Sequence, residues 1–325
     1  FDLVLKNLYF LEGESDWITV ADQRAAEARK QGRTIPLHVH FTAGKKRVVG
    51  TSIDYFEFRN LNVADGTLPF QLGDAVLGHQ AALDLGLGTG DQLLTDQTSL
   101  YDLAAAYPLK LNVTGVLAPG HSPDDEVVFV DVKTAWVIAG IGHGHEDLEK
   151  PENENLLLEK DGETLVGSAA VVEFREITPE VLNSFHFHAQ EDQLPLTAAI
   201  LVPDSVKSAT LLRGHFSVSR ELDLLKPGEV IGSLLAIVLR VKQFFDLSFL
   251  LVSVITVLFL ILVLLLTLKL RDREWDTLFR MGCSRLTVFW MQAAELAILF
   301  FAAVVAATGL ALLFTRLLRL WIPFG

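Results

Sequence analysis

Two long uncharged stretches near the C-terminal end constrain this chain more than any other feature. Residues 247–268 are 22 consecutive residues without a charge, and residues 296–315 form a second such run of 20. A helix rises about 1.5 Å per residue, so either run can cross a hydrocarbon core of roughly 30 Å. Neither run has the polar face that a core helix of a soluble protein usually keeps. We therefore predict transmembrane helices over 247–268 and 286–315, with Glu295 inside the second.

The segment between these runs, residues 269–285, predicts the orientation in the membrane. Its basic residues are Lys269, Arg271, Arg273, Arg280 and Arg285. Two basic residues precede the first span, and two follow the second. An excess of Lys and Arg in a short loop marks the cytoplasmic side. We expect residues 269–285 inside the cell, with residues 1–228 and the short end, residues 316–325, outside.

A large outer domain has to be carried across the membrane, yet the chain starts with Phe1 and shows no signal peptide. We therefore expect an upstream membrane helix before residue 1. The chain also stops just beyond the second span, which leaves room for a further helix there.

Composition limits the classes of function. The formal net charge of −13 divides into +3 over residues 241–325 and −16 over residues 1–240. Such an outer surface disfavours nucleic acid and favours cations or basic partners, although ordinary solubility explains it equally well. Cys283 is the single cysteine, so the outer domain has no disulfide, and at its size a core suffices.

Hydrophobic patterning predicts an α+β outer domain over residues 1–228. Residues 35–41 and 109–117 alternate like strands, and a helix is expected within 16–30. The acidic, Gly-rich segment 140–164 predicts a flexible loop. Residues 229–246 continue into the first span without a helix breaker, which predicts a rigid helical stalk.

Common enzyme signatures are absent. The chain contains no GxxxxGK[ST], HExxH or GxSxG motif. We therefore expect that this chain does not bind ATP through a P-loop of its own and lacks the usual hydrolase signatures.

Six of the nine histidines occur in His-x-His pairs: His38 with His40, His143 with His145, and His186 with His188. Residues two apart on a strand share a face, so each pair can present two imidazoles to one metal ion such as zinc. Glu146 and Asp147 add oxygen donors beside the middle pair. We expect the third pair to ligate with help from the second. The alternative is polar strand faces and a solvated loop.

The segment from Arg273 to Glu295 carries the most specific pattern. It combines a short amphipathic helix, a break at Gly282 and an acidic residue in the next span. This pattern resembles the cytoplasmic coupling helix of ABC transporter permeases of the MacB/FtsX type. The matching residues are Arg273, Glu274, Leu278, Gly282, Ser284, Arg285 and Glu295. Phe279 stands where the family has arginine, and Arg280 follows one residue later. The alternative is a plain interfacial helix.

The resemblance implies which residues contact a cytoplasmic ABC ATPase. They are Arg273, Glu274, Trp275, Leu278, Phe279, Arg280, Gly282 and Arg285. The resemblance also implies that this chain is a non-catalytic membrane subunit, with ATP bound and hydrolysed by that separate subunit.

The outer domain also resembles this family, at residues 48–51, 75–79, 86–91 and 113–117. The histidine segments are similar to a subgroup with a His-rich outer loop. The resemblance implies two lobes, one built from residues 1–60 and 190–225 and one inserted over residues 61–189.

It also implies a homodimeric, multi-pass protein of the bacterial inner membrane whose outer domain is periplasmic. ATP-driven motion would pass through the stalk to that domain (mechanotransmission), serving metal-linked export or envelope trafficking with a periplasmic protein or lipoprotein. Two other classes remain open: a metal-sensing receptor and a membrane-anchored metal-binding chaperone. A neighbouring ATPase gene would favour the transporter.

Overall fold

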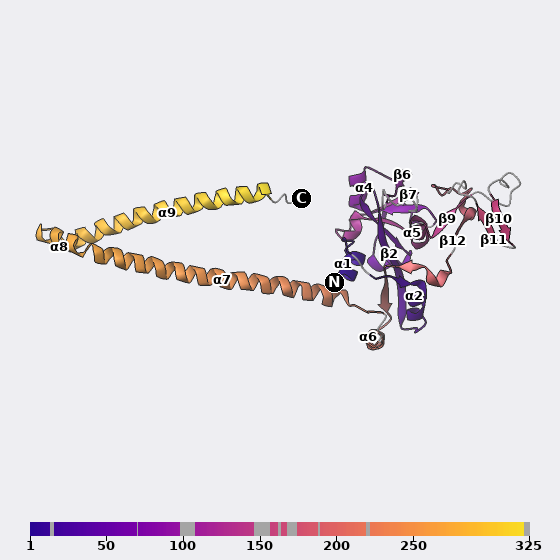
Figure 1. The fold of residues 1–325 in the computed structure, drawn as a ribbon, viewed down its shortest axis with the longest axis horizontal. Coiled ribbons are helices and arrows are strands. Elements are labelled where there is room, and N and C mark those ends of the chain that lie inside the picture. The colour runs from indigo at the N-terminus through magenta and orange to yellow at the C-terminus, as the bar shows by residue number, and fades with distance from the viewer. Residues whose placement is uncertain are drawn as a thin grey trace. The chain divides into compact units, whose positions relative to one another are not determined.

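The computed structural model describes most of the chain and divides it into two compact units, residues 1–233 and residues 234–325 (Figure 1). The described residues are 1–13, 16–69, 71–97, 108–145, 157–161, 164–167, 174–187, 189–218 and 222–321. The first unit is a mixed α+β unit, as predicted, and the second is helical.

An eight-stranded sheet forms the centre of the first unit, in the order β14-β2-β3-β8-β5-β7-β4, with β6 paired to β7. The strands are β2 (Gly32–Ala43), β3 (Lys46–Thr51), β4 (Val63–Gly66), β5 (Asp74–Leu77), β6 (Gln92–Leu94), β7 (Lys110–Leu117), β8 (Val128–Asp131) and β14 (Ala198–Pro203). The β3–β8 and β5–β7 pairs are parallel, and the others are antiparallel. Strands from both expected lobes thus share one sheet, since β3 pairs with β8. The division into lobes stays a prediction.

Both faces of this sheet are packed in its centre. Val48 and Val128 belong to one hydrophobic cluster, whereas their chain neighbours Val49 and Phe129 belong to another. Successive side chains of a strand point to opposite faces, so the two clusters lie on opposite sides of the sheet. Consecutive apolar residues, Val48-Val49 in β3 and Val128-Phe129-Val130 in β8, are typical of strands buried on both faces.

The first unit also contains six short helices: α1 (Asp2–Leu8), α2 (Val20–Glu27), α3 (Asp54–Arg59), α4 (His79–Leu85), α5 (Val132–Ile138) and α6 (Val206–Phe216). A capping box between Thr19 and Asp22 starts α2. The N-cap of α6 is Ser205, which accepts a hydrogen bond from the Ser208 amide. Short 3-10 turns occupy Pro123–Glu126, Leu182–Ser184 and Glu191–Gln193.

A buried carboxylate ties α3 to the 3-10 turn at Pro123. The Asp124 side chain is 1% exposed and accepts hydrogen bonds from Tyr55 Oη at 2.7 Å and Arg59 Nη2 at 2.5 Å. The guanidinium and the phenol satisfy a charge that would otherwise be costly to bury.

Three two-stranded ladders complete the first unit: β1 (Ile18–Thr19) with β13 (Pro195–Leu196), β9 (Gly142–Gly144) with β12 (Phe185–Phe187), and β10 (Leu157–Asp161) with β11 (Thr164–Gly167). The predicted loop over residues 140–164 is therefore wrong at β9, β10 and the start of β11. Residues 142–144 pair with a strand about forty residues further on, which local composition does not reveal.

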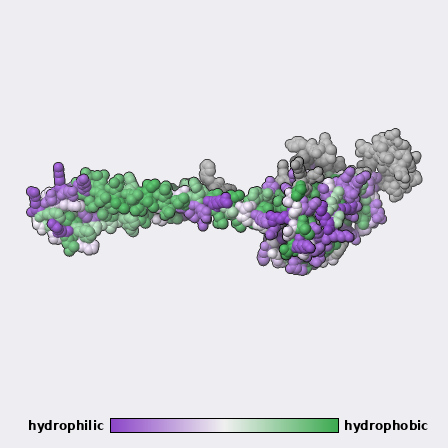
Figure 2. Space-filling model, turned by 90° about the horizontal axis from the view of Figure 1, so that it is seen from below, coloured by the Kyte–Doolittle hydropathy of each residue, from purple (hydrophilic) through white to green (hydrophobic). Residues whose placement is uncertain are grey.

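The second unit consists of two long helices joined by a short one. α7 (Pro227–Leu270) is unbroken over 44 residues, so the predicted stalk and first span form one helix, as expected. α8 (Asp272–Arg280) follows, and α9 spans Arg285–Trp321. By length and composition α7 and α9 can each cross a membrane. Figure 2 shows apolar side chains along these helices and hydrophilic residues gathered at α8.

Candidate functional site

The α8 segment is the first of two candidate sites, and local geometry places it between the two long helices. Gly282 has φ +90°, a conformation that glycine adopts without strain, and it ends the turn after α8. The Ser284 hydroxyl then accepts a hydrogen bond from the Thr287 amide at 3.1 Å and caps α9. The sequence pattern of a helix, a glycine break and a second helix is thus confirmed.

An ion pair joins the start of this segment to α9. The Arg271 guanidinium donates to both carboxylate oxygens of Glu295, with Arg271 Nη2 at 2.9 Å from Glu295 Oε1. A bidentate pair fixes orientation as well as distance. Sequence reasoning placed Glu295 in the second span but did not assign Arg271 as its partner. An acidic residue inside an apolar helix does require such a partner.

The predicted ATPase-contact residues do not all face the same way. Trp275 and Leu278, three residues apart, are half-buried and mark the covered side of α8. The exposed members are Arg273, Glu274, Phe279, Arg280, Gly282 and Arg285. Phe279 is thus the apolar predicted contact that is available to another protein, and it lies next to the Arg280 charge.

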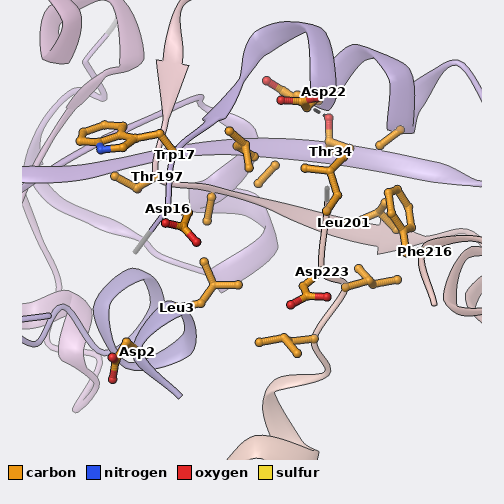
Figure 3. Close-up of a pocket in the computed structure, with 18 of the residues that line it drawn as sticks. Asp2, Leu3, Asp16, Trp17, Asp22, Thr34, Thr197, Leu201, Phe216 and Asp223 are labelled. Carbon is orange, nitrogen blue, oxygen red and sulfur yellow. Dashed lines mark hydrogen bonds between the residues drawn. The ribbon is translucent and has the colours of Figure 1, made fainter. Parts of the chain in front are cut away.

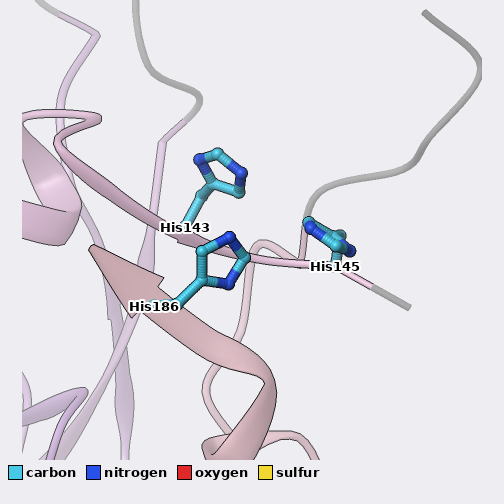
Figure 4. Close-up of side chains that lie close together, drawn as sticks. All are labelled: His143, His145 and His186. Carbon is cyan, nitrogen blue, oxygen red and sulfur yellow. The ribbon is translucent and has the colours of Figure 1, made fainter. Parts of the chain in front are cut away.

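The second candidate site is a cluster of three histidines, His143, His145 and His186 (Figure 4). Their candidate ligand atoms all lie within 4.8 Å of one another. Ring centroids are 5.0 Å apart for His143–His186 and for His145–His186, and 5.6 Å apart for His143–His145. All three side chains are half-buried.

Strand pairing assembles this cluster from two distant segments. His143 of β9 lies directly opposite His186 of β12, and His145 follows His143 by two residues. Opposite residues of an antiparallel pair share a face, as do residues two apart on one strand. The three imidazoles therefore project on one side of the ladder.

One nitrogen of His186 has a defined role. His186 Nδ1 lies 3.1 Å from the carbonyl oxygen of Ser184. A carbonyl oxygen only accepts, so the hydrogen sits on Nδ1 and the lone pair sits on Nε2. This contact sets the tautomer and holds the ring.

The other predicted metal ligands are placed differently. His38 is 1% exposed in β2, and neither of its ring nitrogens has a hydrogen-bond partner among the described residues. His40 is exposed, and both rings lie beside Trp17. His188, Glu146 and Asp147 lie outside the described residues.

A pocket of about 520 Å³ in the first unit was not anticipated from the sequence (Figure 3). Trp17, Leu201 and Phe216 contribute apolar wall, and Asp16 and Asp223 turn carboxylates toward the same space. Its lining residues come from both ends of the sequence of this unit, within residues 1–34 and 197–225, so no local sequence motif reveals the pocket.

Comparison with known proteins finds similarity among solved structures. No protein-family model matches the chain, and no curated protein matches it significantly. Among solved structures, the periplasmic region of MacB from Actinobacillus actinomycetemcomitans is similar at a TM-score of 0.38 and 10% identity, over 68% of this chain and 84% of that one. The extracellular domain of the noncanonic ABC-type transporter YknZ from Gram-positive bacteria is similar at 0.36 and 11%, over 65% and 90%. At these TM-scores we base no argument on either likeness.

Proposed function

We propose that this chain is the membrane subunit of an ATP-driven transporter of the MacB/FtsX type and that α8 is its contact with a separate ABC ATPase. The observation that carries the proposal is the arrangement of α7, α8 and α9. A short amphipathic helix joins two helices of membrane length, and its exposed side carries Phe279 beside charged residues. Aromatic residues and arginine are enriched at protein interfaces.

The Arg271–Glu295 pair supports a mechanical role for this segment. Arg271 directly follows the last residue of α7, and its bidentate ion pair with Glu295 links this end of α7 to α9, the helix that follows α8 in the sequence. Displacement of α8 by an ATPase would therefore be transmitted to both long helices together. Because α7 is unbroken from Pro227 to Leu270, motion at its α8 end reaches the stalk without a hinge.

The proposal includes a place in the cell and a set of partners. Residues 269–285 lie in the cytoplasm of a bacterial cell and residues 1–228 on the periplasmic side of the inner membrane. A second copy of the chain pairs with the first, and a periplasmic protein or lipoprotein receives the motion. ATP enters only through the ATPase subunit.

Co-purification tests the contact. An affinity-tagged chain is extracted from native membranes, and bound polypeptides with a Walker A motif are identified by mass spectrometry. We expect the wild type to retain such an ATPase, and Phe279→Ser with Arg280→Glu to lose it, because an apolar anchor is removed and a contact charge is inverted. The half-buried Leu278 is left intact so that α8 keeps its packing.

The matched control is Leu211→Ser with Lys207→Glu on α6, where an exposed apolar residue and an exposed basic residue lie in the first unit. This variant should retain the ATPase. Equal retention by both double variants, each normally inserted in the membrane, would remove α8 as the contact.

A further inference from the structure

We infer that His143, His145 and His186 form a binding site for a first-row divalent transition-metal ion, with zinc as its simplest probe. The site lies in the first unit and does not depend on the proposed contact with an ATPase. Its support is the donor set, the spacing of the three rings and the construction of the ladder beneath them.

The donor set selects the class of ion. Three imidazoles offer nitrogen ligands, which suit zinc, copper, nickel and cobalt, whereas calcium and magnesium prefer oxygen. His186 Nδ1 donates its hydrogen to the Ser184 carbonyl oxygen, 3.1 Å away, so Nε2 is the ligating atom. A ring whose second nitrogen is hydrogen-bonded to a carbonyl is the usual form of a metal-ligating histidine.

The spacing requires only small rearrangement. Zinc–nitrogen bonds of about 2.0–2.1 Å in a tetrahedron put ligand atoms roughly 3.3 Å apart. The candidate atoms here all lie within 4.8 Å of one another. Rotation about the broad terminal torsion of histidine closes such a gap without moving the strands.

The strands beneath the rings are held by an alternating sequence. Residues 142–145 read Gly-His-Gly-His and residues 185–187 read Phe-His-Phe, so the histidines occupy one face and the glycines and phenylalanines the other. A Cβ added to Gly142 would lie 2.5 Å from the Phe187 ring, and one added to Gly144 would lie 2.6 Å from the Phe185 ring. The two phenylalanines therefore lie directly on the glycine backbone.

These phenylalanines also attach the ladder to the unit. Phe185 and Phe187 pack against a hydrophobic core cluster, and Phe187 meets Trp136 edge-on with ring centroids 6.2 Å apart. One face of the ladder is thus fixed in the core, and the other presents three imidazoles. Ligands on packed strands are better ordered for binding than ligands on a loop.

Three protein nitrogens leave one tetrahedral position for water or for a donor atom of another molecule. Zinc sites that serve structure alone usually use four protein ligands, whereas sites with three protein ligands exchange the fourth. The formal charge of −16 over residues 1–240 attracts cations to this unit. The geometry therefore points to a site that captures and passes on a metal ion.

Calorimetric titration of the full chain in detergent tests the inference, with a tag that contains no histidine and with prior removal of metal by chelator. We expect zinc to bind the wild type at one saturable site. His143→Gln, His145→Gln and His186→Gln should each weaken that site by more than about 100-fold, beyond the 10–100-fold typical of outer-shell changes. His215→Gln on α6, an exposed histidine outside the cluster, is the matched control and should bind like the wild type.

Cobalt provides a second measurement that does not depend on the variants. Cobalt bound by three imidazoles in a four-coordinate site should give visible absorption bands that zinc removes by competition. The inference is overturned if the wild type shows no saturable zinc heat, or if the three single variants bind zinc as tightly as His215→Gln. Absence of competable cobalt bands in the wild type would also overturn it.

Discussion

His38 shows how far the burial of one residue changes its chemistry. Its ring stacks on Phe41 with centroids 5.7 Å apart and lies 5.3 Å from the Trp17 ring. Burial lowers the pKa of His38 to about 4, and the nearby charges of His40 and Lys6 act in the same direction. The folded protein therefore holds this histidine neutral.

We expect His38 to make the fold sensitive to acid. Its folded pKa of about 4 lies below the ordinary value of 6.5, so between these values the unfolded chain binds the extra proton. The stability that this residue contributes is complete above pH 6.5. It is lost as the pH is lowered from 6.5 toward 4, by up to about 1.4 kcal/mol per pH unit. His38→Phe, which suits the aromatic surroundings, should flatten this slope in denaturant unfolding followed by tryptophan fluorescence.

His215→Phe serves as the control, because it makes the same substitution at an exposed histidine outside the core. An identical pH slope for the wild type and His38→Phe would show that folding does not lower the pKa of His38.

At the scale of elements, the β9–β12 ladder depends on two glycines that carry no side chain toward the phenylalanine rings. Neither Gly142 nor Gly144 has a positive φ, so their role is space and not backbone freedom. Such pairing of an aromatic ring over glycine stabilises short strands. It also explains why a segment rich in glycine and acidic residues forms a strand here.

Gly144→Val should loosen this ladder. The added Cβ would lie 2.6 Å from Phe185, and overpacking of this kind costs about 1–3 kcal/mol. We expect faster hydrogen exchange of the amides in β9 and β12 and a lower unfolding midpoint. Gly88→Val is the control, since a Cβ there would meet only Asp91 Oδ2, at 4.0 Å. Equal effects of the two substitutions would contradict this explanation of the ladder.

At the scale of the whole molecule, charge and hydropathy divide the chain in the same place. The acidic α+β unit ends near residue 233, and the helical unit that follows carries two uncharged runs, residues 247–268 and 296–315, on either side of the charged α8. Since basic residues gather between the long helices, this division predicts which side of the membrane each part occupies.

Cys283, the single cysteine, makes this orientation measurable. It is partly accessible and follows Gly282 in the turn after α8. A membrane-impermeant thiol reagent should fail to label it in intact spheroplasts and should label it after permeabilisation, because the proposed orientation puts the turn in the cytoplasm. Labelling without permeabilisation would reverse the orientation and with it the proposed ATPase contact. A Cys283→Ser chain measures the background.

The sequence by itself determined the features that local physics decides. Run length predicted the helices of membrane length, the absence of a breaker predicted an unbroken stalk, and alternation predicted β2 and β7. Each of these depends on neighbours within one element. The His-x-His spacing puts His143 and His145 on one face only within a strand, and the sequence predicted a loop there.

Only the tertiary structure decided which distant segments meet. Three features depend on residues that are far apart in the sequence and that no local periodicity relates. They are the pairing of β9 with β12, the Arg271–Glu295 ion pair and the burial of His38. Residues 140–164 looked like a loop because glycine and acidic residues disfavour strands in isolation. The Phe185 and Phe187 rings, packed between the core and those glycines, supply the apolar contact that local composition lacks. Strand formation there is a property of the pair and not of either segment alone.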